Sequence, residues 1–423
     1  MSAREAEAVE FLRALIAAQT EGEAKVQAIV AERLSDAGCI VDTQRYTPAE
    51  VPVIAEFAAG RAQAAEPRET VIATLPGAAE KRSLLLFAHP DSEPVDDITG
   101  WSHDPFAGTV DGGKIFGWGV ADDLAGVAAG VLAMTAASEA GLPLGQVTLA
   151  SAPSKRHARG VAAALHNGLE ASGAVYLHPA ESGAGLGEIK AFASGQLEFR
   201  VSVSGCLPPT TEPGHTGFAH LGENPVDKAL LLIAALKDLD AARAARIHHP
   251  RLEAAVSRST NLMVSNFLCG ADRKFSRLNE SATFGGALSF PPGETLDDIK
   301  AEVAAAIDAA AKADAFLAHN PPTIEWIAGV TGADCPDEHP LYQCTAAAIR
   351  AATGQTPSVN PMHTSSDIRN PMVQKNIPTV GIGGLAGDLT QNGRTDEWVD
   401  LADFLRMVDA TSAIVRTWCA EAR

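Results

Sequence analysis

The stretch Ser83-Leu-Leu-Leu-Phe-Ala-His-Pro-Asp91 decides the class of fold, because a continuous apolar run leads directly into two polar side chains. An uninterrupted apolar run of this length is typical of a parallel strand that is buried on both faces. His89 follows the run at the carboxyl end of the expected strand, where α/β proteins bind their ligands. Asp91 can orient the imidazole of His89, although a histidine satisfied in a turn, with Asp91 as a cap, is the ordinary alternative.

Strand and helix patterns alternate after this stretch. Residues 147–151 and 175–177 form two more short apolar runs, and residues 124–137 and 161–169 show helical periodicity. Alternating strands and helices predict an α/β fold with a parallel-rich sheet flanked by helices.

The pattern changes after residue 193. Residues 196–204 alternate strictly between apolar and polar side chains, as in a strand with one exposed face. From residue 341 onward the first pattern returns. We therefore expect a catalytic metal-binding domain formed by residues 1–193 and 330–423, interrupted by an inserted α+β domain at residues 194–329.

The composition narrows the class of protein and its partners. With 46% hydrophobic and 20% charged residues, the 423-residue chain is globular and long enough for two domains. A net charge of −19 argues against nucleic acids and anionic membranes as partners. The six cysteines show no disulfide-framework or zinc-ribbon spacing, and the charged N-terminal segment is unlike a signal peptide, so we expect a cytoplasmic protein.

Two more polar blocks lie at the ends of expected elements. Gly117-Trp-Gly-Val-Ala-Asp122-Asp123 brings two acids to the start of a helix, where capping alone would be an ordinary role. Tyr176-Leu-His178-Pro-Ala-Glu181 repeats the first pattern of strand, histidine, proline and acid. Two imidazoles and a carboxylate suit a divalent transition metal with open positions for water and substrate.

Together these blocks resemble the metallopeptidase family of acetylornithine deacetylase, succinyl-diaminopimelate desuccinylase, aminoacylase and glutamate carboxypeptidase. The resemblance covers nearly the whole chain and implies a catalytic domain interrupted by a dimerisation lid. It rests on five blocks, which are residues 89–91 with 100–106, 117–122, 215 with 221–224, 365–367 and 396–399. In this family the aspartate at Asp122 bridges two zinc ions, and the histidine at His215 reaches the active site of the other subunit.

This chain departs from the family at one half of the metal centre. After its second strand the family has Glu-Glu, a general base followed by a ligand, where this chain has Ser154-Lys155-Arg156-His157. The family's last histidine ligand is also missing, near residues 391–394. Both losses affect the same metal site, so the resemblance implies a single ion held by His89, Asp122 and His178.

The remaining roles stay open between several residues. Glu181 would be the third ligand if His178 points away, and it is also the first candidate for the general base, with His215 in trans as the second. A clamp on an anionic substrate or transition state is expected from Lys155 and Arg156, for which a solvated helix start is the alternative. Arg369 and Arg394 are further candidates for the same clamp.

We therefore expect a metal-dependent hydrolase that cleaves a C–N bond in a small carboxylated substrate, with one manganese, zinc or cobalt ion per subunit. Deamination of an aminobenzoate such as 5-nitroanthranilate is the specific expectation, because a single ion and extra cations suit an electron-poor ring carrying a carboxylate. The alternatives are a two-zinc N-acyl-amino-acid deacylase or peptidase with ligands from Glu181 or His363, a non-catalytic binding descendant, and a non-haem iron oxygenase. The lid implies a homodimer or a higher homo-oligomer.

Overall fold

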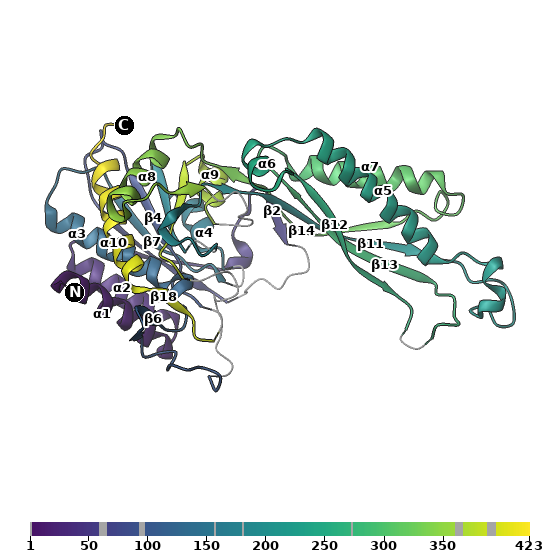
Figure 1. The fold of residues 1–423 in the computed structure, drawn as a ribbon, viewed down its shortest axis with the longest axis horizontal. Coiled ribbons are helices and arrows are strands. Elements are labelled where there is room, and N and C mark those ends of the chain that lie inside the picture. Colours follow the sequence, from purple (N-terminus) through teal and green to yellow (C-terminus); the bar gives the residue numbers. More distant parts are fainter. Residues whose placement is uncertain are drawn as a thin grey trace.

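The computed structural model consists of two parts, each with its own sheet and helices (Figure 1). It describes residues 2–58, 66–92, 98–155, 158–179, 182–271, 274–359, 367–386 and 395–423. Four residues singled out in the sequence lie outside the described residues, and their roles remain predictions: Arg156, Glu181, His363 and Arg394.

The helices and strands follow one another as listed here in chain order. The helices are α1 (Ala3–Ala18), α2 (Glu23–Asp36), α3 (Ala125–Ala140), α4 (Gly160–His166), α5 (Pro225–Arg246), α6 (Pro250–Val256), α7 (Leu296–Ala313), α8 (Pro340–Thr353), α9 (Arg369–Lys375) and α10 (Leu401–Trp418). The strands are β1 (Ile40–Tyr46), β2 (Glu56–Ala58), β3 (Arg68–Leu75), β4 (Leu84–Ala88), β5 (Thr109–Asp111), β6 (Lys114–Phe116), β7 (Val147–Ser151), β8 (Gly173–Leu177), β9 (Glu188–Ile189), β10 (Phe192–Ala193), β11 (Gly195–Ser204), β12 (Asn261–Cys269), β13 (Ser281–Phe290), β14 (Thr323–Val330), β15 (Ala333–Asp334), β16 (Ser358–Val359), β17 (Thr379–Ile382) and β18 (Trp398–Asp400).

The larger part is built on a six-stranded sheet of order β1-β3-β7-β4-β8-β17. The strands β7, β4, β8 and β17 run parallel, which confirms the predicted parallel-rich α/β sheet. At the other edge, β3 runs antiparallel to both of its neighbours, β7 and β1. This edge was not predicted, because β1 is half exposed and its sequence has no continuous apolar run.

Strand β4 is buried on both faces, as its apolar run predicts. Leu84 and Leu86 belong to one hydrophobic cluster with residues of α3 and α10, whereas Leu85 and Phe87 belong to another cluster with residues of α4. Successive side chains of a strand point to opposite faces, so a strand covered by helices on both sides needs apolar residues at every position.

The smaller part, which we call the lid, is an antiparallel sheet of order β12-β13-β11-β14-β2. Side chains of β11 alternate between buried and more exposed positions, as its sequence predicts. The buried ones form a separate cluster with α5 and α7, which confirms the α+β architecture expected of the insertion. Strand β2 is the exception to the expected boundaries, because it precedes β3 in the chain yet completes the lid sheet beside β14.

One helical segment among the described residues, Val120–Ala140, is long and apolar enough to cross a membrane. Its most apolar window is 89% buried within the protein. The segment contains α3, which packs against α10 and the sheet, so its apolar side chains face the protein core.

The lid contains a buried ion-pair network that should carry much of its stability. Arg243 of α5 is fully buried and binds the carboxylates of Glu294 and Glu302. Arg243→Met should lower the free energy of unfolding by about 3 kcal/mol, because Glu294 loses this buried partner and Glu302 keeps only the exposed Arg246. The exposed pair of Arg200 and Glu325 on the lid sheet offers a matched control, and Arg200→Met should cost less than about 1 kcal/mol. Urea denaturation followed by circular dichroism measures both, and equal losses would contradict the prediction.

Candidate metal centre

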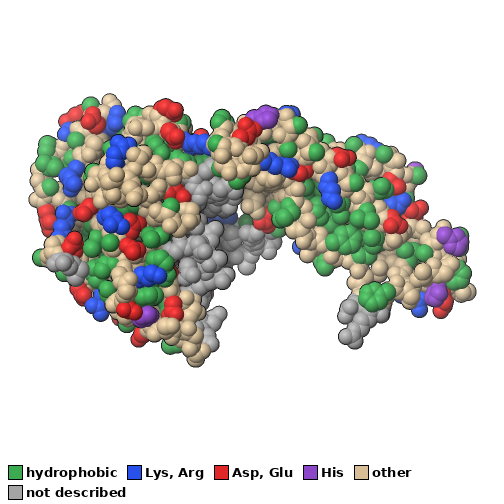
Figure 2. All heavy atoms as spheres, viewed as in Figure 1, with side chains coloured by type: hydrophobic (Ala, Val, Ile, Leu, Met, Phe, Trp, Pro, Cys, Tyr) green, Lys and Arg blue, Asp and Glu red, His purple; other side chains and the backbone are tan. Residues whose placement is uncertain are grey.

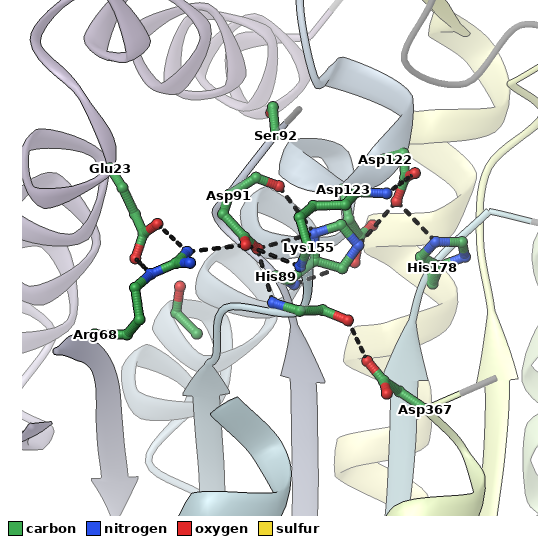
Figure 3. A network of polar contacts seen from close by, with 12 residues as sticks. Glu23, Arg68, His89, Asp91, Ser92, Asp122, Asp123, Lys155, His178 and Asp367 are labelled. Carbon is green, nitrogen blue, oxygen red and sulfur yellow. Dashed lines mark hydrogen bonds and ion pairs between the residues drawn. The ribbon is translucent and has the colours of Figure 1, made fainter. Parts of the chain in front are cut away.

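Three side chains from separate elements converge at the carboxyl edge of the larger sheet (Figure 3). His89 follows β4 and His178 follows β8, and these strands are parallel neighbours, so their carboxyl ends lie side by side. Asp122 lies in the irregular turn Val120–Leu124 just before α3. Asp122 Oδ1 lies 2.8 Å from His89 Nε2 and 2.9 Å from His178 Nε2. The structure therefore brings together the three predicted metal ligands, all of them buried.

Two glycines allow the backbone near Asp122 to approach the strand ends closely. Gly119 has a φ of +64°, and a Cβ at this position would lie 1.9 Å from Ser92 Oγ. A Cβ on Gly126 would lie 1.7 Å from the carbonyl oxygen of Leu177, the last residue of β8. Only glycine fits at either position, which explains how the start of α3 reaches the ends of the strands.

The two acids of the turn do not cap the helix. Asp122 and Asp123 have non-helical backbone angles, and α3 begins after them at Ala125 without a side-chain cap. The capping alternative considered for these acids is therefore wrong. The carboxylate of Asp122 points instead toward the two histidines.

Glu397 holds the backbone of the turn in place. Its buried carboxylate accepts hydrogen bonds from the N–H groups of Gly119, Ala121 and Asp122, at 3.0, 2.7 and 3.1 Å. Burial, together with the negative charge of Asp122, raises the pKa of Glu397 to about 7 despite these three donors. Glu397 therefore positions Asp122 through its backbone.

Each imidazole has a backbone carbonyl on the side away from Asp122. His89 Nδ1 lies 3.1 Å from the carbonyl oxygen of Asp91, and His178 Nδ1 lies 3.1 Å from that of Pro179. For His89, a proton on Nδ1 that is donated to the carbonyl leaves the lone pair on Nε2, which is the form that binds a metal. The buried Lys190 Nζ also approaches His178 Nδ1, at 2.6 Å.

The charges of the centre strongly stabilise one another. Burial disfavours the charged form of His89, but the carboxylate of Asp122 outweighs it and raises the pKa of His89 well above its usual value. Burial likewise opposes the charge of Asp122, but both histidines outweigh it and lower the pKa of Asp122 well below its usual value. Asp122 is therefore ionised, as a metal ligand must be.

Asp91 stabilises the surroundings of His89. One of its carboxylate oxygens accepts from the N–H of Ser154 at 2.8 Å, and the other accepts from the N–H of Lys155 and from Arg68 Nη2, each at 2.9 Å. Burial opposes the charge of Asp91, but hydrogen bonds and the charge of His89 outweigh it and lower its pKa. These contacts agree with the expected role of Asp91 in positioning His89, and a catalytic role for Asp91 itself remains a prediction.

Lys155 contacts the centre directly. Its Nζ forms an ion pair with Asp122 Oδ2, the carboxylate oxygen that does not face the histidines. The side chain of Lys155 is 22% exposed. Its expected position at the site is confirmed, whereas a contact with substrate remains a prediction.

The prediction that Arg369 binds substrate is wrong. Its side chain is buried and donates to the carboxylate of Glu56 and to three backbone carbonyls, which belong to Ile54, Ala55 and Thr331. These contacts tie α9 to the chain segments that enter and leave the lid sheet. Arg369, which is close in sequence to the C-terminal blocks, thus uses its guanidinium to stabilise the junction between the two parts.

His215 lies in the lid and contacts other lid residues. Its Nδ1 accepts from the N–H of Gly217, and its backbone pairs with that of Arg277. Within one chain no contact joins His215 to the described residues of the centre, and its action in a partner's site remains a prediction.

Several residues of the centre escaped the sequence analysis. Arg68 joins the carboxylates of Glu23 and Asp91, but α2 and β3 carry no motif that would indicate this. Lys190 was missed as well, because the strand before it, β9, has only two residues and gives no strand pattern in the sequence. Glu397 was part of a recognised block, yet nothing in the sequence assigned it a role.

Two imidazoles and a carboxylate at the carboxyl edge of a parallel-rich sheet define a candidate metal-binding α/β protein. The comparisons with known proteins agree. The sequence model of Peptidase family M20/M25/M40 matches residues 85–417. The chain belongs to this peptidase family.

Relatives and solved structures extend the similarity over most of the chain. A succinyl-diaminopimelate desuccinylase from Rhodospirillum centenum is 26% identical over 357 residues, which cover 81% of this chain and 83% of that protein. A tripeptidase structure from Staphylococcus aureus has a TM-score of 0.68 at 15% identity, over 99% of both chains. A dinuclear metal-binding M20 peptidase from Bacillus subtilis has a TM-score of 0.59 at 14% identity, over 98% of this chain and 99% of that one. At these identities the structures show a shared fold.

The raised pKa of Glu397 gives metal-free protein a defined pH dependence. Between the ordinary pKa near 4.5 and the folded value near 7, the folded state keeps a proton that the unfolded state has lost. The free energy of unfolding should therefore fall by about 1.4 kcal/mol per pH unit in this window because of Glu397. Glu397→Gln removes this contribution, so denaturation of both proteins at pH 5, 6 and 7 should show a shallower decline for the variant. Parallel pH profiles would contradict the prediction.

Proposed function

We propose that this chain is a hydrolase that binds one divalent transition-metal ion through His89, Asp122 and His178 and cleaves a C–N bond in a small carboxylated substrate. The observation that carries the proposal is the convergence of two imidazole Nε2 atoms on a single carboxylate oxygen. Membership of the family supports metal-dependent hydrolysis. The number of ions and the substrate are our inference.

The donor set fits a divalent transition metal. Its two nitrogens and one oxygen suit zinc, manganese or cobalt, and all ligand atoms lie within 4.8 Å of one another. When bound, such an ion acts as a Lewis acid and lowers the pKa of water from about 16 toward 7.

Other residues of the chain position the metal ligands and accept the proton. Glu397 holds Asp122 through its backbone N–H, and the backbone carbonyl of Asp91 accepts from His89 Nδ1. Ser154 stands where the family has its general base, and its hydroxyl donates to Asp367 at 2.6 Å, so it offers no carboxylate for proton transfer. We propose Glu181 as the proton acceptor, because it follows His178 by three residues, with His215 of a second subunit as the alternative.

The substrate is expected to be an anion held by local cations. A chain with a net charge of −19 repels anions at long range, so binding needs cations at the site itself. Lys155 lies at the centre, and Arg156 and Arg394 are the remaining candidates. N-acyl amino acids fit this description and agree with the desuccinylase relatives.

Deamination of an electron-poor aminobenzoate is a second candidate function. The observation that favours it is the Ser154-Lys155 pair in place of two glutamates, which puts a cation beside the centre where negative charge develops on an attacked ring. The carboxylate of an aminobenzoate such as 5-nitroanthranilate would meet the same cations.

Turnover should require the ion and each of its histidine ligands. Metal-stripped protein should be inactive toward those N-acyl amino acids and aminobenzoates in a test panel that the intact protein hydrolyses, and added manganese, zinc or cobalt should restore activity.

His89→Ala should weaken metal binding by more than about a hundredfold, because loss of a group that merely supports a ligand already costs 10- to 100-fold. The exposed His166→Ala is the matched control. Calorimetric metal titration and substrate assays measure both effects, and full activity without metal would refute the proposal.

The same panel separates the two candidate functions. Release of a carboxylic acid from N-acyl amino acids indicates deacylation, whereas ammonia release from aminobenzoates indicates deamination. Absence of turnover on every member, with metal bound, would favour a binding protein.

We also propose that two copies associate through the lid. Strand β12 is an edge strand, and it exposes Met263 by 59%, Phe267 by 40% and Leu268 by 63%. Figure 2 shows hydrophobic side chains gathered on the lid surface. An exposed apolar edge strand tends to pair with another strand. In an isologous dimer the β12 strands of the two copies would cover each other.

Disrupting this edge should give monomers. The double variant Met263→Lys with Leu268→Lys places charges on the proposed interface, whereas Leu142→Lys adds a charge at an exposed apolar position of the larger part. Light scattering coupled to gel filtration should find dimers for the unmodified protein and for Leu142→Lys, and monomers for the double variant. A monomeric unmodified chain would rule out this assembly.

A further inference from the structure

We propose that the ammonium group of Lys155 takes the place of a second metal ion at this centre, so that each chain binds a single ion. The inference rests on the proposed function, because it assumes that a metal binds at His89, Asp122 and His178. Lys155 would then determine how many metal ions the centre binds.

The two oxygens of Asp122 face different partners. Oδ1 lies between His89 Nε2 and His178 Nε2, whereas Oδ2 forms an ion pair with Lys155 Nζ. A carboxylate that bridges two ions offers one oxygen to each. Here one oxygen belongs to the donor set for a metal, and the other already neutralises a positive charge of the chain itself.

The backbone that carries Lys155 is fixed on several sides. The N–H groups of Ser154 and Lys155 both donate to Asp91, and the Ser154 hydroxyl donates to Asp367 (Figure 3). The ammonium group that pairs with Asp122 therefore extends from a segment whose backbone is held by hydrogen bonds.

A cation at this position stabilises the ionised form of Asp122. Asp122 shares its surroundings with Asp123 and Glu397, all three of which are buried carboxyl groups. Like charges at short range in a buried site raise the free energy of the ionised state, and an opposite charge within hydrogen-bond distance offsets it. Lys155 supplies that charge permanently, whereas a metal ion would do so only when bound.

A lysine is also incompatible with a second ion at the same oxygen. An ammonium group offers three donors and no lone pair, so it cannot act as a ligand while it is charged. A divalent ion next to it would also meet electrostatic repulsion. The same side chain thus compensates Asp122 and blocks the second site.

Metal counting tests the proposal without any need for turnover. Unmodified protein, Lys155→Met and Lys155→Glu are titrated with manganese by calorimetry, and their metal content is measured by mass spectrometry after dialysis. The exposed Lys25→Met, in the same part of the chain, is the control for loss of a lysine.

The unmodified chain and Lys25→Met should each bind one ion with the same affinity. Lys155→Met should bind its single ion at least about tenfold more tightly, because a competing positive charge has been removed from Asp122. Lys155→Glu restores a carboxylate where the family has one, so its content should rise from one ion to two. Thermal melting should also show a larger stabilisation by manganese for Lys155→Met than for the unmodified protein.

Three results would overturn the proposal: two ions in the unmodified chain, unchanged manganese affinity in Lys155→Met, or a folded Lys155→Glu that stays at one ion. If Lys155→Glu does not fold, the count for the unmodified chain and the affinity of Lys155→Met decide alone. Failure of the proposed function has a separate signature, which is an unmodified chain that binds its ion and hydrolyses nothing in the panel, or binds no ion.

Discussion

The centre depends on keeping one carboxylate charged inside the protein. Asp122 is only 8% exposed, and an isolated ionised group at such a position would cost several kcal/mol. Two imidazoles on one oxygen and an ammonium group on the other offset this cost. Glu397 adds a constraint of a different kind, because it fixes the backbone of the turn that carries Asp122.

The sheet supplies the rigid frame for this arrangement. Parallel neighbouring strands end at the same edge, so β4 and β8 deliver His89 and His178 side by side without any special loop. Glycines then let the start of α3 press against the end of β8. On our proposal, the chain keeps one half of the family's metal centre and places Lys155, which pairs with Asp122, in the other half. The change is local, because it leaves the frame of the family fold intact.

The lid has its own hydrophobic core and its own buried ion-pair network. It is joined to the larger part through Arg369, whose guanidinium binds the backbone on both sides of the junction. The cation next to the C-terminal blocks therefore stabilises the junction between the parts, whereas Lys155 and Lys190 contact the centre itself. The two parts are thus stabilised separately and meet at a buried polar joint.

The sequence by itself determined the parallel-rich sheet, the α+β character of the insertion and the three side chains of the centre. These features follow from local patterns, since apolar runs and strict alternation report burial on two faces or one, and a histidine after a buried strand must lie at the sheet edge. Only the tertiary structure decided what the cations do. Arg369 and Lys155 are both cations that the sequence predicts to bind substrate. In the structure Arg369 instead bonds to the backbone at the junction between the two parts, and Lys155 forms an ion pair with Asp122. The partner of a charged side chain can lie in another element, 33 residues away for Lys155 and Asp122 and 313 for Arg369 and Glu56, and no local pattern encodes which one it is.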